Sequence, residues 1–397
     1  MTRTETVPDA SDIVIVGGGV VGTSITYFLS ERTDDNITLL EKNQIGSGST
    51  GDSSAILRHH YGPNDMYSRM AWWSHEFYRS FEEETGQPIA YASSPMVRFG
   101  EENTVGGEYA LNGYHTLKAN DIPATRYSKT EIPDAFPMLT ISDADFAISD
   151  DTAGYSDGTD VAGGFSRAAQ DNGADIITGV NVEDLDVQGN DVVVRTAENE
   201  IRCDNVVVAA GPWTPQLTET IGVDVPVTPE REQILILDPP EAFAEEHPEL
   251  TPTTAPPGGT WYMRPDFGDH VLVATHHRGR QADPDGYKNT PDEEVILELL
   301  DEMEDIIPDL IQSDIVGQYC GIYSTTPDHD FIIDEIMDNF YVACGFSGHG
   351  FKHAPVIGRG ICEYIVDGGT DLFDLEYFSL DRFDEAPDGH GLPEDNA

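Results

Sequence analysis

The segment Asp12-Ile-Val-Ile-Val16-Gly17-Gly-Gly19-Val-Val-Gly22 decides the fold. Its first half is an apolar, β-branched run that is typical of a central parallel strand, and glycines follow at the spacing Gly-x-Gly-x-x-Gly. Residues 23–30 continue with helical periodicity, and Asn36–Leu40 forms a second strand-like run that ends at Glu41. This order predicts a βαβ unit that binds a dinucleotide.

The residue types in this unit suit a pyrophosphate and a ribose. The glycines Gly17, Gly19 and Gly22 allow a tight turn and bring backbone N–H groups, with Val21 beside them, to the positive end of the helix. The Glu41 carboxylate stands where it can bond both ribose hydroxyls. The motif alone does not separate FAD from NAD, so a purely NAD-dependent dehydrogenase is one alternative.

Two later apolar strands also run into glycines and are expected in the same sheet. They are Asn205–Ala210, before Gly211, and Asn339–Ala343, before Gly345. We therefore expect a discontinuous nucleotide-binding domain, interleaved with a substrate domain, and a mobile acidic tail. The expected nucleotide-binding segments are 11–88, 148–225 and 325–383, the substrate segments are 89–147 and 226–324, and the tail is 384–397.

One helix of the substrate domain has a marked beginning. Thr290 is expected to cap it, Pro291 to occupy the first helical position, and Glu293 to close a capping box. Apolar residues at helical spacing between 295 and 306 predict its buried face.

The net charge is extreme, because 73 Asp and Glu stand against 21 Lys and Arg, giving −52 at pH 7. The acidic residues are spread along the chain, which fits a solvating surface in a salt-adapted cytosol such as that of a halophilic archaeon. Nucleic acid and anionic membranes are poor partners for such a surface. The sequence shows no membrane span and no signal peptide, so a cytoplasmic protein is expected.

The four cysteines are widely spaced, with no C-x-x-C pair, so neither a disulfide framework nor a zinc site is indicated. Most are expected to be small core residues. No histidine and carboxylate spacing suggests any other metal site.

Further motifs narrow the choice of cofactor. Gly46-Ser-Gly-Ser-Thr50-Gly is a small-residue loop that can bind a second phosphate or lie against a flavin, and Ala209-Ala-Gly211-Pro-Trp213 closes a strand as flavoproteins do. With Thr325–Asp334 and Gly345–Lys352, these motifs make residues 12–381 similar to the D-amino-acid oxidase superfamily of FAD enzymes, particularly its sarcosine oxidase and dehydrogenase branch. The resemblance implies an α/β fold, α+β overall, with a Rossmann-like FAD-binding domain interleaved with an antiparallel-sheet substrate domain.

Lys352 is expected to take part in catalysis. It is one of only five lysines, and it begins a helix behind a glycine turn, where its charge and the helix dipole can stabilise negative charge on a reduced flavin. In the family the matching lysine holds the substrate carboxylate. Arg58 matches a family arginine that binds the same carboxylate in bidentate geometry, although an ordinary salt bridge is the alternative.

The resemblance implies further site residues. Tyr262 corresponds to an active-site tyrosine or is a packed aromatic, Tyr323 matches a family tyrosine, and His349 is placed to tune protons near the flavin or is structural. The remaining residues expected to bind FAD are Lys42, Ser49, Thr50, Val182, Ala210, Gly211, Trp213, Gly321, Gly345, Gly348, Gly350 and Phe351, with Lys352 itself.

Some positions depart from the sarcosine oxidase pattern. Gly321 stands where monomeric sarcosine oxidases attach FAD through a cysteine, and Cys320, one residue away, should point away from the flavin, so non-covalent FAD is expected. Val273 is assigned to the position of the oxygen-activating lysine, which favours a dehydrogenase over an oxidase. Ala55 replaces a further family arginine, so the loop over the flavin should differ.

These features predict an FAD-dependent oxidoreductase that removes hydride from the C–N bond of a small amino or N-methylamino acid, such as sarcosine. The imine product would hydrolyse, and an electron carrier or O2 would accept the electrons. Alternatives are a D-amino-acid, glycine or dimethylglycine dehydrogenase of the same superfamily, or a flavin-binding subunit of a larger complex.

Overall fold

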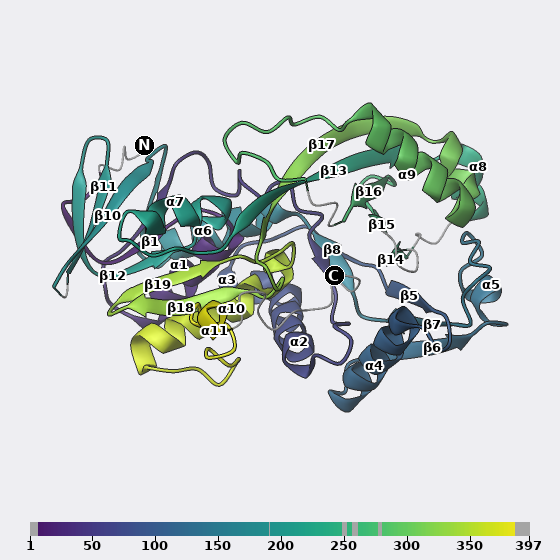
Figure 1. Cartoon of the computed structure of the whole chain (residues 1–397), viewed down its shortest axis with the longest axis horizontal. Coiled ribbons are helices and arrows are strands. Elements are labelled where there is room, and N and C mark those ends of the chain that lie inside the picture. The colour runs from purple at the N-terminus through teal and green to yellow at the C-terminus, as the bar shows by residue number, and fades with distance from the viewer. Residues whose placement is uncertain (1–6, 190, 248–251, 256–260, 277–279, 386–397) are drawn as a thin grey trace.

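The computed structural model describes residues 7–189, 191–247, 252–255, 261–276 and 280–385. Two eight-stranded sheets lie toward opposite ends of the molecule, and the long strands of the second sheet reach back toward the first (Figure 1). The architecture is therefore a mixed α/β fold with two sheet regions, as the sequence predicts.

The first sheet is built around β1 (Ala10–Val16), which pairs in parallel with both β2 (Ile37–Glu41) and β12 (Glu200–Val208). Parallel pairing continues from β2 to β9 and from β12 to β19. The sheet is completed by β9 (Asp175–Thr178), β10 (Val182–Gln188), β11 (Asp191–Thr196), β18 (Ile332–Met337) and β19 (Phe340–Cys344). The predicted βαβ unit is thus confirmed.

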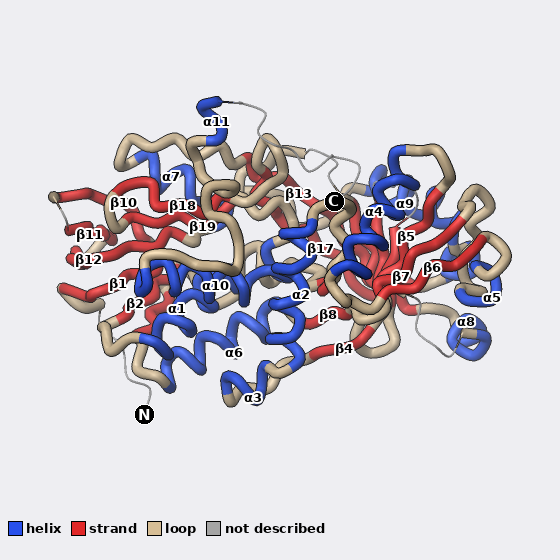
Figure 2. Tube along the Cα trace, turned by 90° about the horizontal axis from the view of Figure 1, so that it is seen from below, coloured by secondary structure: helices blue, strands red, loops and turns tan. Residues whose placement is uncertain are grey.

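Strand β1 is buried on both faces, which explains its continuous apolar run. Ile13 and Ile15 face a core shared with helices, whereas Val14 and Val16 face a second core on the other side of the sheet. The helical side is covered by α1 (Val20–Arg32), α2 (Asp65–Arg79), α6 (Gly158–Asp171) and α10 (Gly350–Asp367), which lie together in Figure 2.

The second sheet joins two separate stretches of the chain. Its strands, in spatial order, are β17 (Asp314–Thr325), β13 (Thr228–Asp238), β16 (Val271–Thr275), β15 (Trp261–Pro265), β14 (Thr253–Ala255), β5 (Met96–Gly100), β7 (Phe146–Asp150) and β6 (Ala124–Ser128). All pairs are antiparallel except β14 with β5. The expected antiparallel sheet is therefore confirmed, with one parallel pairing where the two stretches of chain meet.

Smaller elements connect these layers. A three-stranded sheet contains β3 (Ile56–Leu57), β8 (Gly154–Ser156) and β4 (Tyr91–Ser93). The remaining helices are α3 (Phe81–Thr85), α4 (Val105–Ala119), α5 (Ile132–Ala135), η1 (Gly211–Trp213), α7 (Thr214–Glu219), α8 (Glu241–Glu246), α9 (Glu293–Ile306), η2 (Pro308–Gln312) and α11 (Arg382–Glu385). Of the predicted tail, 384 and 385 belong to α11 and the rest lies outside the described residues.

The predicted start of α9 is wrong by two residues. The residue before its first turn is Asp292 instead of Thr290, and no side chain caps the helix. The Asp292 carboxylate is instead held by Arg231, Arg280 and Lys288. The predicted buried face is present, because Val295, Leu299 and Met303 are fully buried.

The described helices include none that is long and apolar enough to cross a membrane. The four cysteines are buried free thiols, which confirms their expected place in the core. Within the described ranges, no three His, Cys, Asp or Glu side chains gather as a metal-binding group.

Candidate active site

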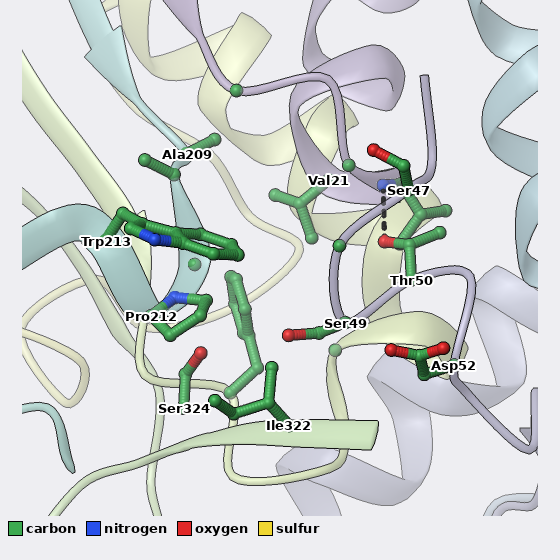
Figure 3. A pocket seen from close by; sticks show the side chains of 18 of the residues that line it. Val21, Ser47, Ser49, Thr50, Asp52, Ala209, Pro212, Trp213, Ile322 and Ser324 are labelled. Carbon is green, nitrogen blue, oxygen red and sulfur yellow. Dashed lines mark hydrogen bonds between the residues drawn. The ribbon is translucent and has the colours of Figure 1, made fainter. Parts of the chain in front are cut away.

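A cavity of about 750 Å³ lies at the carboxyl ends of β1 and β2. The glycine turn, the loop 47–54, the turn after β12 and the inner end of β17 surround it, so segments far apart in sequence meet there. Figure 3 shows Trp213 and Pro212 on one side, with Ser49 and Asp52 across from them. Doubly wound sheets bind their ligands at this edge, and the volume is that of a cofactor-sized site.

The glycines are required by close backbone approaches. A Cβ on Gly17, which has φ +114°, would lie 2.4 Å from the carbonyl oxygen of Ala209, and a Cβ on Gly22 would lie 2.0 Å from the oxygen of Gly17. The first turn of α1 faces the cavity, and its Val20 N–H donates a hydrogen bond to Thr50 Oγ1 at 3.0 Å. The positive end of α1 is therefore held where a pyrophosphate can reach it.

Charged and aromatic groups line the end of the cavity beyond β2. The Glu41 carboxylate accepts hydrogen bonds from the N–H groups of Gly18 and Asn43, both at 2.7 Å. The Lys42 ammonium lies 3.5 Å from the centre of the Trp213 ring, and both side chains bond to Asp285. Residues of both sheet regions thus close this end.

Nearly all of the residues predicted to bind FAD line this cavity; the exceptions are Gly22, Gly345 and Lys352. Gly22 instead allows α1 to pack on the strand, and a Cβ on Gly345 would meet Thr326 at 2.5 Å. Predicted residues that do line it are Gly17, Gly19, Val21, Glu41, Lys42, Ser49, Thr50, Val182, Ala210, Gly211, Trp213, Gly321, Gly348, Gly350 and Phe351.

Beside the cavity lies a buried cluster that contains the predicted Arg58, His349 and Lys352. Arg58 donates to the carbonyl oxygen of His60, lies 4.3 Å from the centre of the Tyr61 ring and approaches His349 Nδ1 at 3.4 Å. Lys352, in the first turn of α10, donates a long 3.5 Å hydrogen bond to the Gly348 carbonyl oxygen. The structure therefore brings together two cations that the sequence places almost 300 residues apart.

Burial makes these cations unusual. Arg58 is 5% exposed and Lys352 7% exposed, and neither forms an ion pair with a carboxylate in the described part of the chain. Desolvation, and then repulsion by Arg58, lower the pKa of Lys352 well below its ordinary value of 10.5. Such a pair can receive a carboxylate from a ligand.

The two predicted tyrosines line the cavity and are hydrogen-bonded to each other. Burial, reinforced by Tyr262, raises the pKa of Tyr323 well above its ordinary value, and burial also raises the pKa of Tyr262. Both hydroxyls therefore stay protonated as hydrogen-bond donors. A Cβ on Gly348 would lie 2.7 Å from the Tyr323 ring, so only glycine fits there.

The assignment of Val273 to a position over the flavin is wrong. Its side chain packs in the core under α9 with Leu235 and Met263, on the face of the sheet that points away from the cavity. Leu272 and Ala274 share the opposite face with Tyr262. A one-residue error in matching a strand reverses the face, because side chains alternate.

The same alternation agrees with the expectation for Cys320. Gly321 lines the cavity, where its Cβ would lie 3.0 Å from Asp52 Cβ, whereas Cys320 is fully buried and does not line it.

Sequence reasoning missed four acidic residues that line the cavity, namely Asp52, Glu183, Glu232 and Asp285. Glu232 is 2% exposed on β13 and accepts a hydrogen bond from Thr275 Oγ1. A carboxylate next to the apolar run of β13 was a usable signal. Asp285 lies in a loop, and nothing in the local sequence marks it.

A parallel sheet with a glycine turn, a dinucleotide-sized cavity and buried cations beside it defines a dinucleotide-dependent oxidoreductase. Residues 12–364 match the family described as FAD dependent oxidoreductase, DAO, and the chain belongs to that family. The resemblance inferred from the motifs is thereby confirmed at the family level.

Individual relatives cover nearly the whole chain. A monomeric sarcosine oxidase of Streptomyces avermitilis is 28% identical over 372 residues, which are 90% of this chain and 94% of the relative. An L-proline dehydrogenase from P. horikoshii superposes with a TM-score of 0.85 at 26% identity, covering 96% of this chain and 99% of the other. A glycine oxidase from Geobacillus kaustophilus has the same fold, with a TM-score of 0.80 at 22% identity over 94% and 99% of the two chains.

Proposed function

We propose that this oxidoreductase binds FAD in the 750 Å³ cavity and removes hydride from the C–N bond of a small amino or N-methylamino acid. The observation that carries the proposal is the pair of buried cations, Arg58 and Lys352, that lacks a carboxylate partner in the described chain and lies beside the cavity. Similarity to a monomeric sarcosine oxidase and to an L-proline dehydrogenase supports the substrate class.

The residues present fit FAD. The glycine turn and the positive end of α1 would hold the pyrophosphate, and the Glu41 carboxylate would exchange its backbone partners for ribose hydroxyls. FAD, when bound, supplies the hydride acceptor. With Gly321 at the cavity wall and Cys320 directed elsewhere, we propose that FAD is held without a covalent bond.

The chain's own residues would position the substrate. Arg58 and Lys352 would hold its carboxylate, and the Tyr262 hydroxyl, which accepts a hydrogen bond from Tyr323, would donate one beside the reacting carbon. Fixing the carboxylate in this way leaves the Cα–H and the neutral amine little freedom, which is how binding energy is converted into rate. The imine product would hydrolyse to a carbonyl compound and an amine.

We further propose that electrons pass to a carrier in preference to O2. The face of β16 toward the cavity carries Leu272 and Ala274, so this strand places no lysine there. The charge of −52, spread along the chain, supports a salt-rich cytoplasmic setting as an additional proposal.

The deciding experiment is anaerobic mixing of the FAD-loaded protein, in molar KCl, with sarcosine, glycine, dimethylglycine, L-proline and D-amino acids, while flavin absorbance is recorded. Bleaching by at least one of them supports the proposal, and the preferred compound fixes the substrate. Slow recovery after air is admitted supports a carrier, and fast recovery supports O2. Absence of bleaching with every compound would refute the proposed function.

A variant pair ties the reaction to the cations. Lys352→Met should abolish bleaching while FAD stays bound, because the carboxylate loses one of its two partners. Lys118→Met removes an exposed lysine from α4 and should leave bleaching unchanged. Equal rates in both variants would show that Lys352 does not hold the substrate.

A further inference from the structure

A third cation, Arg98, lies on the substrate side of the second sheet. It is on β5 and pairs with Ala255 of β14, which in the antiparallel register stands opposite Tyr262 of β15. Cross-strand neighbours share a face, so Arg98 points to the same side as Tyr262, with only the small Ala255 between them. Two strand spacings put the Arg98 and Tyr262 backbones about 9–10 Å apart.

The contacts of Arg98 lead back to Arg58. Its guanidinium lies 5.4 Å from the centre of the Tyr109 ring, and that ring lies 5.4 Å from the His60 ring. His60 accepts the hydrogen bond of Arg58 through its carbonyl oxygen. On the other side, Arg58 acts electrostatically on Tyr323, which is bonded to Tyr262. Arg98 therefore lies close enough to Arg58 for the two charges to repel each other, next to the tyrosines of the cavity.

Arg98 has no hydrogen bond or ion pair with any residue that the structure describes, and its Nε is buried without a partner. Burial lowers its pKa to about 10, and repulsion by Arg58 acts in the same direction. Other partly buried arginines differ in this respect: Arg231 is paired with Asp292, Arg359 with Glu363 and Arg382 with Asp328. The chain has 73 acidic residues, so a shortage of carboxylates does not explain why Arg98 lacks a partner among the described residues.

Nearby carboxylates have other partners. Asp150 binds the backbone N–H and ring of His59, and Glu232 accepts the hydroxyl of Thr275. Arg58 thus has two further cations close enough to repel it, Lys352 and Arg98. One substrate carboxylate satisfies Arg58 and Lys352, and it leaves the partly buried charge of Arg98 without a partner, which has a cost in free energy.

We propose that Arg98 binds a second anionic group, carried by the side chain of the substrate, so that the substrate class is a dicarboxylic amino or N-methylamino acid. This inference rests on the proposed function, which assigns the first carboxylate to Arg58 and Lys352. Arginine suits the role, because its planar fork binds a carboxylate through two hydrogen bonds and stays charged when buried.

The test compares acids with their neutral isosteres: N-methylaspartate with N-methylasparagine, N-methylglutamate with N-methylglutamine, and sarcosine as the short reference. Anaerobic flavin bleaching gives the rate and half-saturation concentration for each. Succinate and glutarate, which cannot be oxidised at a C–N bond, give a second readout through the rise in Tm on binding, with acetate as the monocarboxylate control.

Arg98→Leu should weaken binding of the better acid by about 100-fold and leave sarcosine within about three-fold, since a buried charge pair is lost only with the acid. Arg98→Lys should restore part of the loss and guards against a folding defect of the leucine variant. The matched control is Arg126→Leu, because Arg126 occupies the same cross-strand row on β6 and lies 5.2 Å from the Phe146 ring, but is exposed.

The outcomes separate this inference from the proposed function. A wild-type protein that treats acids and amides alike, or an Arg98→Leu variant that weakens sarcosine and the acids equally, would overturn the role of Arg98 while leaving the function intact. If no amino acid bleaches the flavin, the proposed function fails. The dicarboxylate Tm shift then still decides: its loss only in the Arg98 variants supports the anion site, and its absence from the wild type overturns it.

Discussion

Replacing Lys352 by methionine should make the substrate-free protein more stable. Lys352 is 7% exposed, its only hydrogen bond to the described part of the chain is the 3.5 Å contact to the Gly348 carbonyl oxygen, and Arg58 repels it. Methionine keeps the length of the side chain and removes the buried charge. Replacing buried charges by apolar groups of similar volume is neutral or stabilises by about 1–4 kcal/mol, and we expect about 2 kcal/mol here.

The size of the effect in a thermal scan follows from the chain length. With about 2.1 cal/mol/K of unfolding entropy per residue over 397 residues, a gain of about 2 kcal/mol raises Tm by about 2 °C. Urea unfolding gives the free energy directly. Lys118→Met is the matched control, because it removes the same unit of positive charge from a chain of net charge −52 at an exposed position, and its effect should stay within about 0.5 kcal/mol.

The pH dependence gives the sign of the effect independently. The pKa of Lys352 is lower in the folded chain than its ordinary 10.5, so the unfolded chain binds the proton more tightly. The destabilisation is complete below the folded pKa and disappears as the pH rises from there toward 10.5. The advantage of Lys352→Met should therefore be larger at neutral pH than in alkaline buffer, and it should shrink as the pH approaches 10.5. A methionine variant that is less stable than wild type at pH 7 by more than 1 kcal/mol would refute the reasoning.

Three further predictions address the cofactor turn, the buried contact between Asp150 and His59, and the thiol of Cys320. Gly22→Ala places a methyl group 2.0 Å from the Gly17 oxygen, so it should lower the FAD content of the purified protein and reduce the free energy of unfolding by at least about 2 kcal/mol. The control Gly106→Ala, whose methyl group meets nothing within 4 Å, should be neutral or stabilising. Equal flavin content in the two purified variants would contradict this prediction. Burial raises the pKa of Asp150, but the charge and hydrogen bonds of His59 outweigh it and lower the pKa overall. Asp150→Asn should therefore reduce the free energy of unfolding by about 3–5 kcal/mol at pH 7, and the difference from wild type should narrow as the pH falls below 3.8. A difference in urea unfolding that does not change with pH would count against a stabilising contact between Asp150 and His59. Cys320→Ala should leave flavin content unchanged, and acid precipitation should release the flavin from both proteins; yellow colour retained by the wild-type pellet alone would show a covalent bond at Cys320.

Local patterns in the sequence were enough to predict the nucleotide-binding unit. The run 12–16 is buried on both faces, and the spacing of Gly17 and Gly22 reflects backbone contacts made within a few residues or with the adjacent strand. Lys352 stands out in the sequence because it ends the motif Gly345–Lys352 and because lysine is rare in this chain. Local sequence patterns of this kind can be interpreted without knowledge of the tertiary structure.

The errors and omissions share a physical origin in tertiary contacts, which the local sequence does not show. Assigning Val273 to the flavin side required knowing the phase of β16, and a one-residue offset places it in the opposite core. The start of α9 depended on competition between Thr290 and Asp292, which was decided by basic side chains distant in sequence. Arg98 gave no local signal at all, because its neighbours Ala255 and Tyr262 are known only from the pairing of β5 with β14 and of β14 with β15.

The distribution of charge in the folded chain strengthens the case for an anionic substrate. Seventy-three carboxylates are available, yet the described carboxylates near Arg58, Lys352 and Arg98 are hydrogen-bonded to other groups, and Arg58 repels both Lys352 and Arg98. A protein optimised for stability alone would neutralise or replace them. Retaining them is physically reasonable where a ligand supplies the missing negative charge, because ligand binding then relieves the repulsion in addition to forming hydrogen bonds. At the same total concentration of carboxylate groups, a dicarboxylate should therefore raise Tm by more than a monocarboxylate does. The reason is that one dicarboxylate molecule makes both contacts and loses its translational freedom once, whereas two monocarboxylate molecules each lose theirs.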